Sequence, residues 1–245
     1  MTFMEFLSSG IVGNYFSGNM SDPKSIVFVA ISVFVTMVAA YLLGSINFAI
    51  IISGKQYKQD IREFGSKNAG MTNMMRTYGK KAAGYTLLGD ALKAVVSCII
   101  GYTLIGHLGA YVAGLFCILG HIFPVYYKFK GGKGVVTTAI AILMCDPFVF
   151  LVLITIFVII VAFTKYISLG SVICVMLCPI LSDKFSRLLR GFPTPFSAFA
   201  IVIAILVVFK HWTNIKRLLN GTESKFSFKK SVKAPETTEA KEENK

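Results

Sequence analysis

The stretch GHIFPVYYKFKGGKG, residues 120–134, joins one apolar segment to the next through a basic, glycine-rich loop. Apolar runs at 108–127 and 134–145 flank this loop, so we expect it at a membrane surface. Glycines let backbone N–H groups approach an anion, Lys133 adds a positive charge, and the following helix presents the positive end of its dipole. The stretch therefore predicts a helical membrane protein with an anion site, and phosphate is the expected anion.

The composition of the whole chain is typical of a polytopic membrane protein. The chain has 245 residues, 55% of them hydrophobic, and a mean hydropathy of +0.68. A full span needs about 20 apolar residues. Apolar runs lie at 26–53, 83–106, 108–127, 134–145, 147–164, 166–182 and 195–211. We predict an all-α transmembrane bundle of about seven helices, with five or six spans as alternatives.

Asp146 and Pro147 predict a helix boundary, because proline favours the first position of a helix and aspartate favours the cap before it. The run 134–145 is too short for a full span. It forms either a short, half-penetrating helix or one kinked span together with 147–164, and the sequence leaves both open.

Loop charges orient the predicted bundle. Seven Lys and Arg lie in 54–82, three in 128–133 and nine from Lys210 onward. With seven spans these clusters share one side, so the positive-inside rule places the N-terminus outside and the C-terminus in the cytoplasm. The trio Lys184, Arg187 and Arg190 falls on the other side and argues against this orientation. Because the basic clusters flank apolar spans, we expect lipid and an anionic substrate as partners, and no nucleic acid.

The sequence divides into three parts. Residues 1–24 are an N-terminal extension without the basic start and clean apolar core of a signal peptide. Residues 25–220 form the transmembrane domain, and residues 221–245 are predicted to be a polar, disordered tail rich in lysine and glutamate. The five cysteines show neither a CxxC spacing nor a histidine at metal-ligand distance, so no metal site is expected.

A second informative stretch, DIREFGSKNAGMTNMMR, occupies residues 60–76. It combines flexible glycines with small hydroxyl and amide side chains, and Arg76 supplies a fork that suits phosphate oxygens. Taken alone, it is equally well a solvated loop of turn-forming residues. Two such loops on one predicted face favour a site for a polyol phosphate.

Five further polar residues lie inside or next to apolar runs. Lys93 follows Asp90 by one turn inside the second run, and ionisable residues there usually face the bundle interior. The alternative is an ion pair that neutralises itself near the interface. His121 ends the third run, while His211 and Asn214 share one helix face after the last run. An interfacial histidine and an ordinary helix cap are the alternatives for these positions.

Several reaction classes are excluded. The GGKG loop is not a Walker A motif, because Gly134 follows Lys133 where magnesium binding needs Ser or Thr. No histidine precedes an aspartate by four residues, as in the acyl-CoA acyltransferase dyad, and GxSxG and HExxH do not occur.

In this order, the motifs resemble those of the bacterial acyl-phosphate:glycerol-3-phosphate acyltransferases, an integral-membrane family that makes lysophosphatidic acid. The resemblance covers about residues 26–220. It rests on GSINFA at 44–49, GSKNAGMTN at 65–73 with Arg76, the stretch 120–134, and KHxxN at 210–214. Asn47 stands where the family usually has proline, and Lys67 and Met71 stand where it usually has glycine and alanine.

The resemblance implies transfer of a fatty acyl group from acyl phosphate to the 1-hydroxyl of sn-glycerol 3-phosphate, the first step of phospholipid synthesis. It implies a cell-membrane enzyme with its site at the cytoplasmic face and no metal or other cofactor. The soluble enzyme that makes acyl phosphate is an expected partner. The residues expected to be catalytic are Ser66, Arg76, Lys133, His211 and Asn214. Those expected to bind substrate or phosphate are Ser45, Gly65, Asn68, Gly70, Thr72, Asn73, Lys93, His121, Gly131, Gly132 and Gly134.

Within this scheme Ser66 and Arg76 bind one phosphate, and Lys133 with the glycine amides binds the other. The general base is left open between a substrate phosphate and either His121 or His211. The alternative function is a multipass transporter for an anionic phosphate ester, which should have a mid-membrane site on interrupted helices. A non-catalytic lipid-binding scaffold leaves the two phosphate-type loops unexplained.

Overall fold

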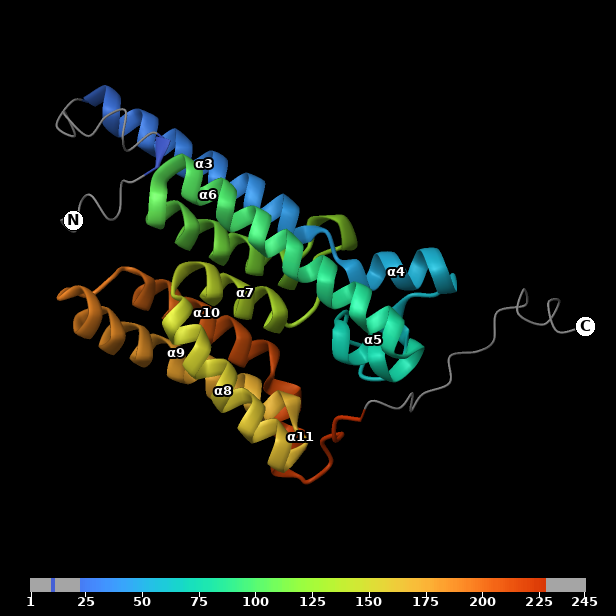
Figure 1. Ribbon diagram of the computed structural model, residues 1–245. Helices are drawn as coiled ribbons and strands as arrows, with labels where there is room; N and C mark the ends of the chain where they lie inside the picture. Colours follow the sequence, from blue (N-terminus) through green and yellow to red (C-terminus); the bar gives the residue numbers. More distant parts are fainter. Residues whose placement is uncertain (1–9, 12–22, 228–245) are drawn as a thin grey trace, which may run out of the picture.

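The computed structural model describes residues 10–11 and 23–227, and most of the predicted N-terminal extension and tail lies outside them. Within these ranges the chain forms helices and no strands, which confirms the predicted all-α fold (Figure 1). The α-helices are α3 (Pro23–Ser45), α4 (Phe48–Tyr57), α5 (Met71–Tyr78), α6 (Lys80–Ile122), α7 (Val135–Cys145), α8 (Pro147–Thr164), α9 (Ile167–Arg190), α10 (Phe196–Lys210) and α11 (Trp212–Leu219). Two short 3-10 helices, η1 (Ile61–Glu63) and η2 (Val125–Tyr127), lie in the loops.

Helix α6 is a hairpin of two limbs. Ile105 and Gly106 leave the helical conformation, and Gly106 adopts a φ of +61°, which glycine tolerates. The chain reverses there, so a Cβ added to Gly101 would lie 2.1 Å from the carbonyl oxygen of Gly109. The two limbs, visible in green in Figure 1, correspond to the separate predicted runs 83–106 and 108–127.

Among the described residues, four helices are long and apolar enough to cross a membrane, or five if the bent pair α10 and α11 is one span. In this count of candidate spans, the two limbs of the α6 hairpin are taken as one helix. Only 11% of the apolar windows of α3 and of α8 is buried in the protein, as expected for helices that face lipid. The predicted orientation of the termini stays a prediction.

Helix α7 is separate from α8, as the Asp146-Pro147 signal predicts. Asp146 leaves the helical conformation, and its carboxylate accepts a hydrogen bond of 3.3 Å from the Val149 amide at the start of α8. With 11 residues, α7 is the short helix that was one of the two alternatives.

Helix α3 crosses the second limb of α6 at very close range. A Cβ added to Gly44 would lie 2.2 Å from the carbonyl oxygen of Cys117, and one added to Gly120 would lie 2.2 Å from that of Tyr41. The crossing therefore requires glycine on both helices. Because Gly120 begins the glycine-rich stretch, the crossing also fixes where that loop leaves the bundle.

We predict that Gly44→Ala lowers the free energy of unfolding by about 1–3 kcal/mol, the typical cost of overpacking. The matched control is Gly84→Ala, where an added Cβ meets nothing within 4 Å. This control should raise stability by about 0.4–1 kcal/mol, because alanine restricts the unfolded chain. Thermal unfolding of both variants in one detergent measures the difference, and equal midpoints would contradict the close crossing.

Candidate functional site

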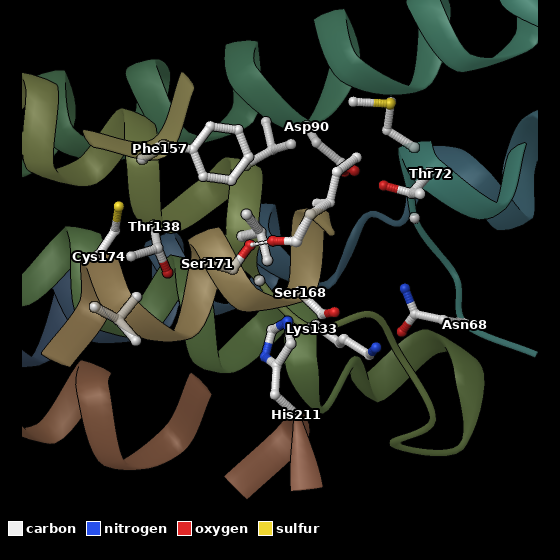
Figure 2. A pocket seen from close by; sticks show the side chains of 18 of the residues that line it. Asn68, Thr72, Asp90, Lys133, Thr138, Phe157, Ser168, Ser171, Cys174 and His211 are labelled. Atoms are coloured by element: carbon white, nitrogen blue, oxygen red, sulfur yellow. Dashed lines mark hydrogen bonds between the residues drawn. The ribbon is translucent and has the colours of Figure 1, made fainter. Parts of the chain in front are cut away.

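A cavity of about 450 Å³ opens between α5, α7, α8, α9, the start of α11 and the two limbs of α6. One half is polar, and the other is lined by apolar side chains of α7, α8 and α9. Figure 2 shows Asn68, Thr72, Lys133 and His211 toward one end, and Phe157 and Cys174 toward the other. Such a cavity suits an amphipathic ligand with a polar head and an apolar chain.

Most of the residues predicted for the site meet in this cavity, although they come from four separated parts of the chain. All five expected catalytic residues are among them. The predicted residues that line the cavity are Ser66, Asn68, Gly70, Thr72, Asn73, Arg76, His121, Lys133, Gly134, His211 and Asn214. Those that do not line it are Ser45, Gly65, Lys93, Gly131 and Gly132.

Gly131 and Gly132 serve close packing. Their amides donate to the carbonyl oxygens of Ile122 at 3.3 Å and His121 at 3.1 Å. A Cβ on Gly131 would lie 2.1 Å from the His121 carbonyl oxygen, and one on Gly132 would lie 2.2 Å from His121 Nε2. This corrects the expectation that both amides face an anion: the pair folds the loop back against the end of α6.

Ser45 and Gly65 do not line the cavity but hold the segments that form it. The Ser45 hydroxyl donates to the Tyr41 carbonyl at 2.8 Å and accepts from the Val125 amide at 3.3 Å, which joins α3 to the glycine-rich stretch. Gly65 adopts a φ of +57°, and a Cβ there would lie 2.3 Å from Asn73 Oδ1. Both residues are thus structural supports in this arrangement.

Lys93 is buried in a polar cluster beside the cavity. Its ammonium donates to the carbonyl oxygens of Gly44 at 2.9 Å and Ile46 at 2.6 Å. It also lies 3.0 Å from Asp90 Oδ1 and 2.9 Å from His121 Nδ1. Both alternatives raised for Lys93 hold in part: it pairs with Asp90, and it faces the bundle interior.

The N-terminus of α7 opens onto the cavity with Lys133 directly before it. Gly134, Val135 and Val136 line the cavity, and the first amides of a helix have no partner within the helix. The Lys133 ammonium donates to Asn214 Oδ1 of α11. Burial lowers the pKa of Lys133 to about 8, and Glu223 opposes this shift. A buried ammonium beside a helix N-terminus is suited to hold a phosphate.

The loop before α5 is held by one amide side chain. Asn73 Oδ1 accepts from the Ser66 amide at 2.9 Å, while Asn73 Nδ2 donates to the carbonyl oxygens of Ile61 at 3.2 Å and Phe64 at 2.9 Å. The loop therefore presents Ser66, together with Arg76 of α5, to the cavity.

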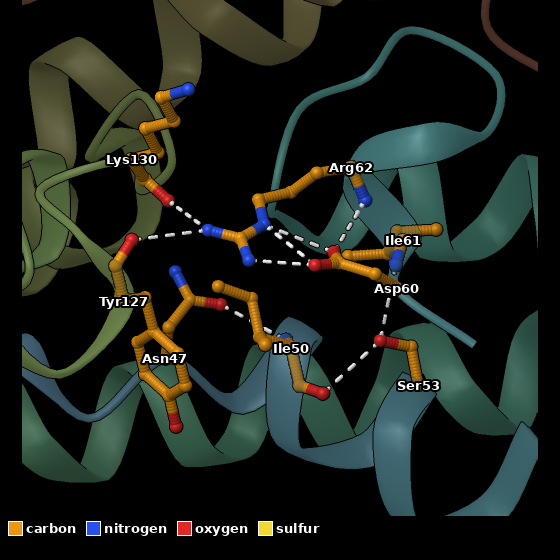
Figure 3. A network of polar contacts seen from close by, with 8 residues as sticks. All are labelled: Asn47, Ile50, Ser53, Asp60, Ile61, Arg62, Tyr127 and Lys130. Atoms are coloured by element: carbon orange, nitrogen blue, oxygen red, sulfur yellow. Dashed lines mark hydrogen bonds and ion pairs between the residues drawn. The ribbon is translucent and has the colours of Figure 1, made fainter. Parts of the chain in front are cut away.

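Arg62 ties this loop to the glycine-rich stretch. Figure 3 shows its guanidinium between the carboxylate of Asp60, with the shortest N–O distance 2.6 Å, and the carbonyl oxygens of Tyr127 and Lys130. The distances to the two carbonyl oxygens are 3.2 Å and 3.0 Å. The Asp60 contact raises the pKa of Arg62, so the guanidinium that joins the two loops stays charged.

The two histidines differ in their surroundings. His211 Nδ1 lies 2.8 Å from the carbonyl oxygen of Val207, so this nitrogen donates and Nε2 is left as an acceptor. His121 Nδ1 instead lies 2.9 Å from the Lys93 ammonium, and its ring belongs to the buried cluster of Lys93 and Asp90. His211 is therefore the better placed of the two to accept a proton.

Sequence reasoning missed one acidic residue of the site. Glu223, which falls in the predicted tail, lines the cavity and bonds to Ser168, Asn214 and Arg217. The sequence showed only a single glutamate in a polar segment, and composition alone predicts that such a residue is exposed to solvent. Asp90, noticed only as the neighbour of Lys93, lines the cavity as well.

Of the three departures from the family pattern, Asn47 has a clear structural role, whereas nothing in the structure explains Lys67 or Met71. Asn47 caps α4: its Oδ1 accepts from the Ile50 amide at 3.1 Å, so it starts the helix where proline usually stands. Lys67 adopts a φ of +57°, a conformation that glycine takes without strain. Met71 lines the cavity at the start of α5. Within the described part of the chain, no group of three or more His, Cys, Asp or Glu side chains is arranged for a metal ion.

Known proteins resemble this chain along most of its length. The family model described as glycerol-3-phosphate acyltransferase matches residues 34–221. A glycerol-3-phosphate acyltransferase from Finegoldia magna is 42% identical over 194 residues, which cover 77% of this chain and 93% of the relative. One from Thermoanaerobacter pseudethanolicus is 40% identical over 198 residues, which cover 81% and 98%.

Solved structures agree. The crystal structure of PlsY (YgiH), an integral membrane glycerol 3-phosphate acyltransferase, in its glycerol 3-phosphate form, matches with a TM-score of 0.72 and 34% identity. The match covers 80% of this chain and 96% of that one. The lysophosphatidic acid form of PlsY matches with a TM-score of 0.70 and 33% identity. Fold, membrane helices and sequence thus lead to one conclusion: the chain belongs to the glycerol-3-phosphate acyltransferase family of integral membrane proteins.

Proposed function

We propose that this protein transfers a fatty acyl group from acyl phosphate to the 1-hydroxyl of sn-glycerol 3-phosphate, giving lysophosphatidic acid and phosphate. The observation that carries the proposal is the division of the cavity into a basic, hydroxyl-rich half and an apolar half. An acyl phosphate has this same division, and the product keeps it. The forms in which PlsY was solved, with glycerol 3-phosphate and with lysophosphatidic acid, support the same acceptor and product.

Each of two helix N-termini in the cavity serves one phosphate. At α7, Lys133 stands beside the free amides of the first turn. At α5, Gly70 and Thr72 line the cavity next to Ser66 and Arg76. His211 and Asn214 line the same cavity, with Asn214 bonded to Lys133, and position the glycerol hydroxyls.

The reaction needs no strong base, since acyl phosphate is an activated mixed anhydride. The 1-hydroxyl oxygen attacks the acyl carbonyl carbon, the bond from that carbon to the phosphate oxygen breaks, and phosphate leaves with the bonding electrons. A substrate phosphate oxygen takes the hydroxyl proton. Lys133 and the α7 amides stabilise the negative charge on the leaving phosphate.

The setting follows from the charges of the loops. The site faces the cytoplasm, where the positive-inside rule places the loops that carry Arg76 and Lys133. Acyl phosphate then reaches the enzyme from a soluble enzyme that makes it, while the acyl chain lies among the spans. The protein uses no metal or organic cofactor.

The first test is an assay of detergent-purified protein with palmitoyl phosphate and glycerol 3-phosphate, with palmitoyl-CoA as a parallel donor. We expect phosphate release that depends on both substrates, formation of lysophosphatidic acid, and no product from palmitoyl-CoA. Product from palmitoyl-CoA would contradict the donor class. No turnover by protein shown to be folded would instead favour the transporter.

Lys133 should set the alkaline limit of activity. Only its ammonium form holds phosphate, and burial lowers its pKa to about 8, so activity should be present below this pH and fall as the pH rises through it. Lys133→Met should reduce kcat/KM by about 100-fold or more, as expected for loss of one charged donor in the transition state. The measurement is kcat/KM against pH, corrected for spontaneous hydrolysis of acyl phosphate. An unchanged rate well above pH 8 would contradict this role.

Substitution of the histidines tests the base. If a substrate phosphate takes the proton, His211→Gln should lower kcat by no more than about tenfold, because positioning alone is lost. A general base typically contributes about 100- to 10,000-fold, so a fall of that size would assign the base to His211. His121→Gln is the matched comparison, with its ring engaged by Lys93; a loss confined to this variant would assign the base to His121.

A further inference from the structure

Residues 221–227, the C-terminal strap, fold back onto the cavity after α11. Gly221 adopts a φ of +68°, and the Thr222 amide donates to the Arg217 carbonyl at 2.8 Å, which reverses the chain. Further along, the Ser224 carbonyl accepts from Arg76 at 3.1 Å, and the Phe226 amide donates to the Lys165 carbonyl at 2.7 Å. The strap is therefore bonded to three other parts of the chain.

Glu223 is the one acidic side chain of the strap, and its carboxylate is fully engaged. Oε1 accepts from the Ser168 hydroxyl at 2.7 Å and from Asn214 Nδ2 at 2.6 Å. Oε2 lies 2.7 Å from Arg217 Nε, and only 6% of the side chain is exposed. A buried carboxylate with three donors is a fixed part of the site.

Glu223 acts on Lys133 through Asn214. The amide of Asn214 presents its NH2 group to Glu223 and its oxygen to the Lys133 ammonium. The opposite orientation would set the amide oxygen against the carboxylate and the NH2 group against the ammonium, so both contacts would repel. The carboxylate thus fixes which way the amide points and where the ammonium is held.

We infer that Glu223 is a positioning residue for the acyl transfer: it orients Asn214 and keeps the Lys133 ammonium placed and charged in the polar half of the cavity. The inference rests on the proposed function, in which Lys133 holds a phosphate. It adds a second role to the strap, beyond closing that side of the cavity.

The charged groups around Lys133 predict the direction in which each substitution shifts the pH dependence of activity. The groups that face it come from the strap, α11, α5 and α10, and they are Glu223, Arg217, Arg76, Lys210 and His211. Burial is the largest cause of the lowered pKa of Lys133; Glu223 raises this pKa, while Arg217 lowers it. Removal of the carboxylate and removal of its Arg217 partner should therefore move the alkaline limit of activity in opposite directions.

The experiment compares Glu223→Gln with Arg217→Met in the full-length protein. The glutamine side chain has nearly the shape of glutamate, and its oxygen can still accept from Asn214 and Ser168. We expect the alkaline limit of kcat/KM to fall by about one pH unit in E223Q, a shift typical of loss of a nearby opposite charge. In R217M it should rise. Lys225→Gln, which removes a charge from the same strap outside the cavity, should leave the limit unchanged.

A purely structural role for the Glu223–Arg217 ion pair makes a different prediction. Both variants would then lose the same contact, so their thermal midpoints would fall together and their pH limits would stay where the wild type has it. That result, or shifts in the same direction, would overturn the inference. If E223Q cannot be purified in a folded form, R217M alone tests the inference. An alkaline limit of kcat/KM that is unchanged or lower in R217M contradicts it.

The wild-type assay separates this inference from the proposed function. Wild-type protein that forms no lysophosphatidic acid from acyl phosphate refutes the function itself. Wild-type protein that forms it, with variants whose pH limits do not move in opposite directions, refutes only the role of Glu223.

Discussion

The buried ammonium of Lys93 is the interaction on which the arrangement of the site depends. It lies on the first limb of α6, bonds to the carbonyl oxygens of Gly44 and Ile46 where α3 ends, and contacts His121 on the second limb. Carbonyls at a helix end lack intrahelical partners, and a cation there also complements the helix dipole. Asp90, 3.0 Å away, neutralises the charge. Lys93 thus holds three helical segments together at one point. Removing one partner of a buried ion pair typically costs about 3–5 kcal/mol of folding free energy.

The loops that carry the proposed phosphate ligands depend on a few side chains bonded to backbone. Asn73 closes the loop before α5, and Arg62 joins that loop to the glycine-rich stretch through two carbonyl oxygens. Gly131 and Gly132 let the stretch fold tightly against His121. Loops without regular secondary structure are thereby fixed well enough to present Ser66 and Lys133 to the same cavity.

Helix boundaries were predictable where a residue carries a local signal. Asp146 and Pro147 separate α7 from α8, because capping depends on residues next to each other in sequence. The two limbs of α6 were predicted as separate apolar runs, although the role of Gly106 in the reversal was not. The shared cavity of Ser66, Arg76, Lys133, His211 and Asn214 was predictable from motifs and resemblance. Periodicity gave no signal for Glu223, since its partners lie up to 55 residues away on other segments. Periodicity also did not indicate that the amides of Gly131 and Gly132 bond to carbonyl oxygens within the protein, because these bonds depend on how the loop folds.

The shortness of α7 bears on how a lipid substrate meets water. Its 11 residues extend only about 16 Å, roughly half the hydrocarbon thickness of a bilayer. Its N-terminus borders the polar half of the cavity, and its next turns, with Ala139 and Ile142, border the apolar half. Extracting a fatty chain from hydrocarbon costs about 0.8 kcal/mol per methylene. In the proposed reaction the chain stays in an apolar medium throughout, and only its head group is exchanged. A chain of any length that the apolar half admits is then handled without the solubility cost that would otherwise grow with each added carbon.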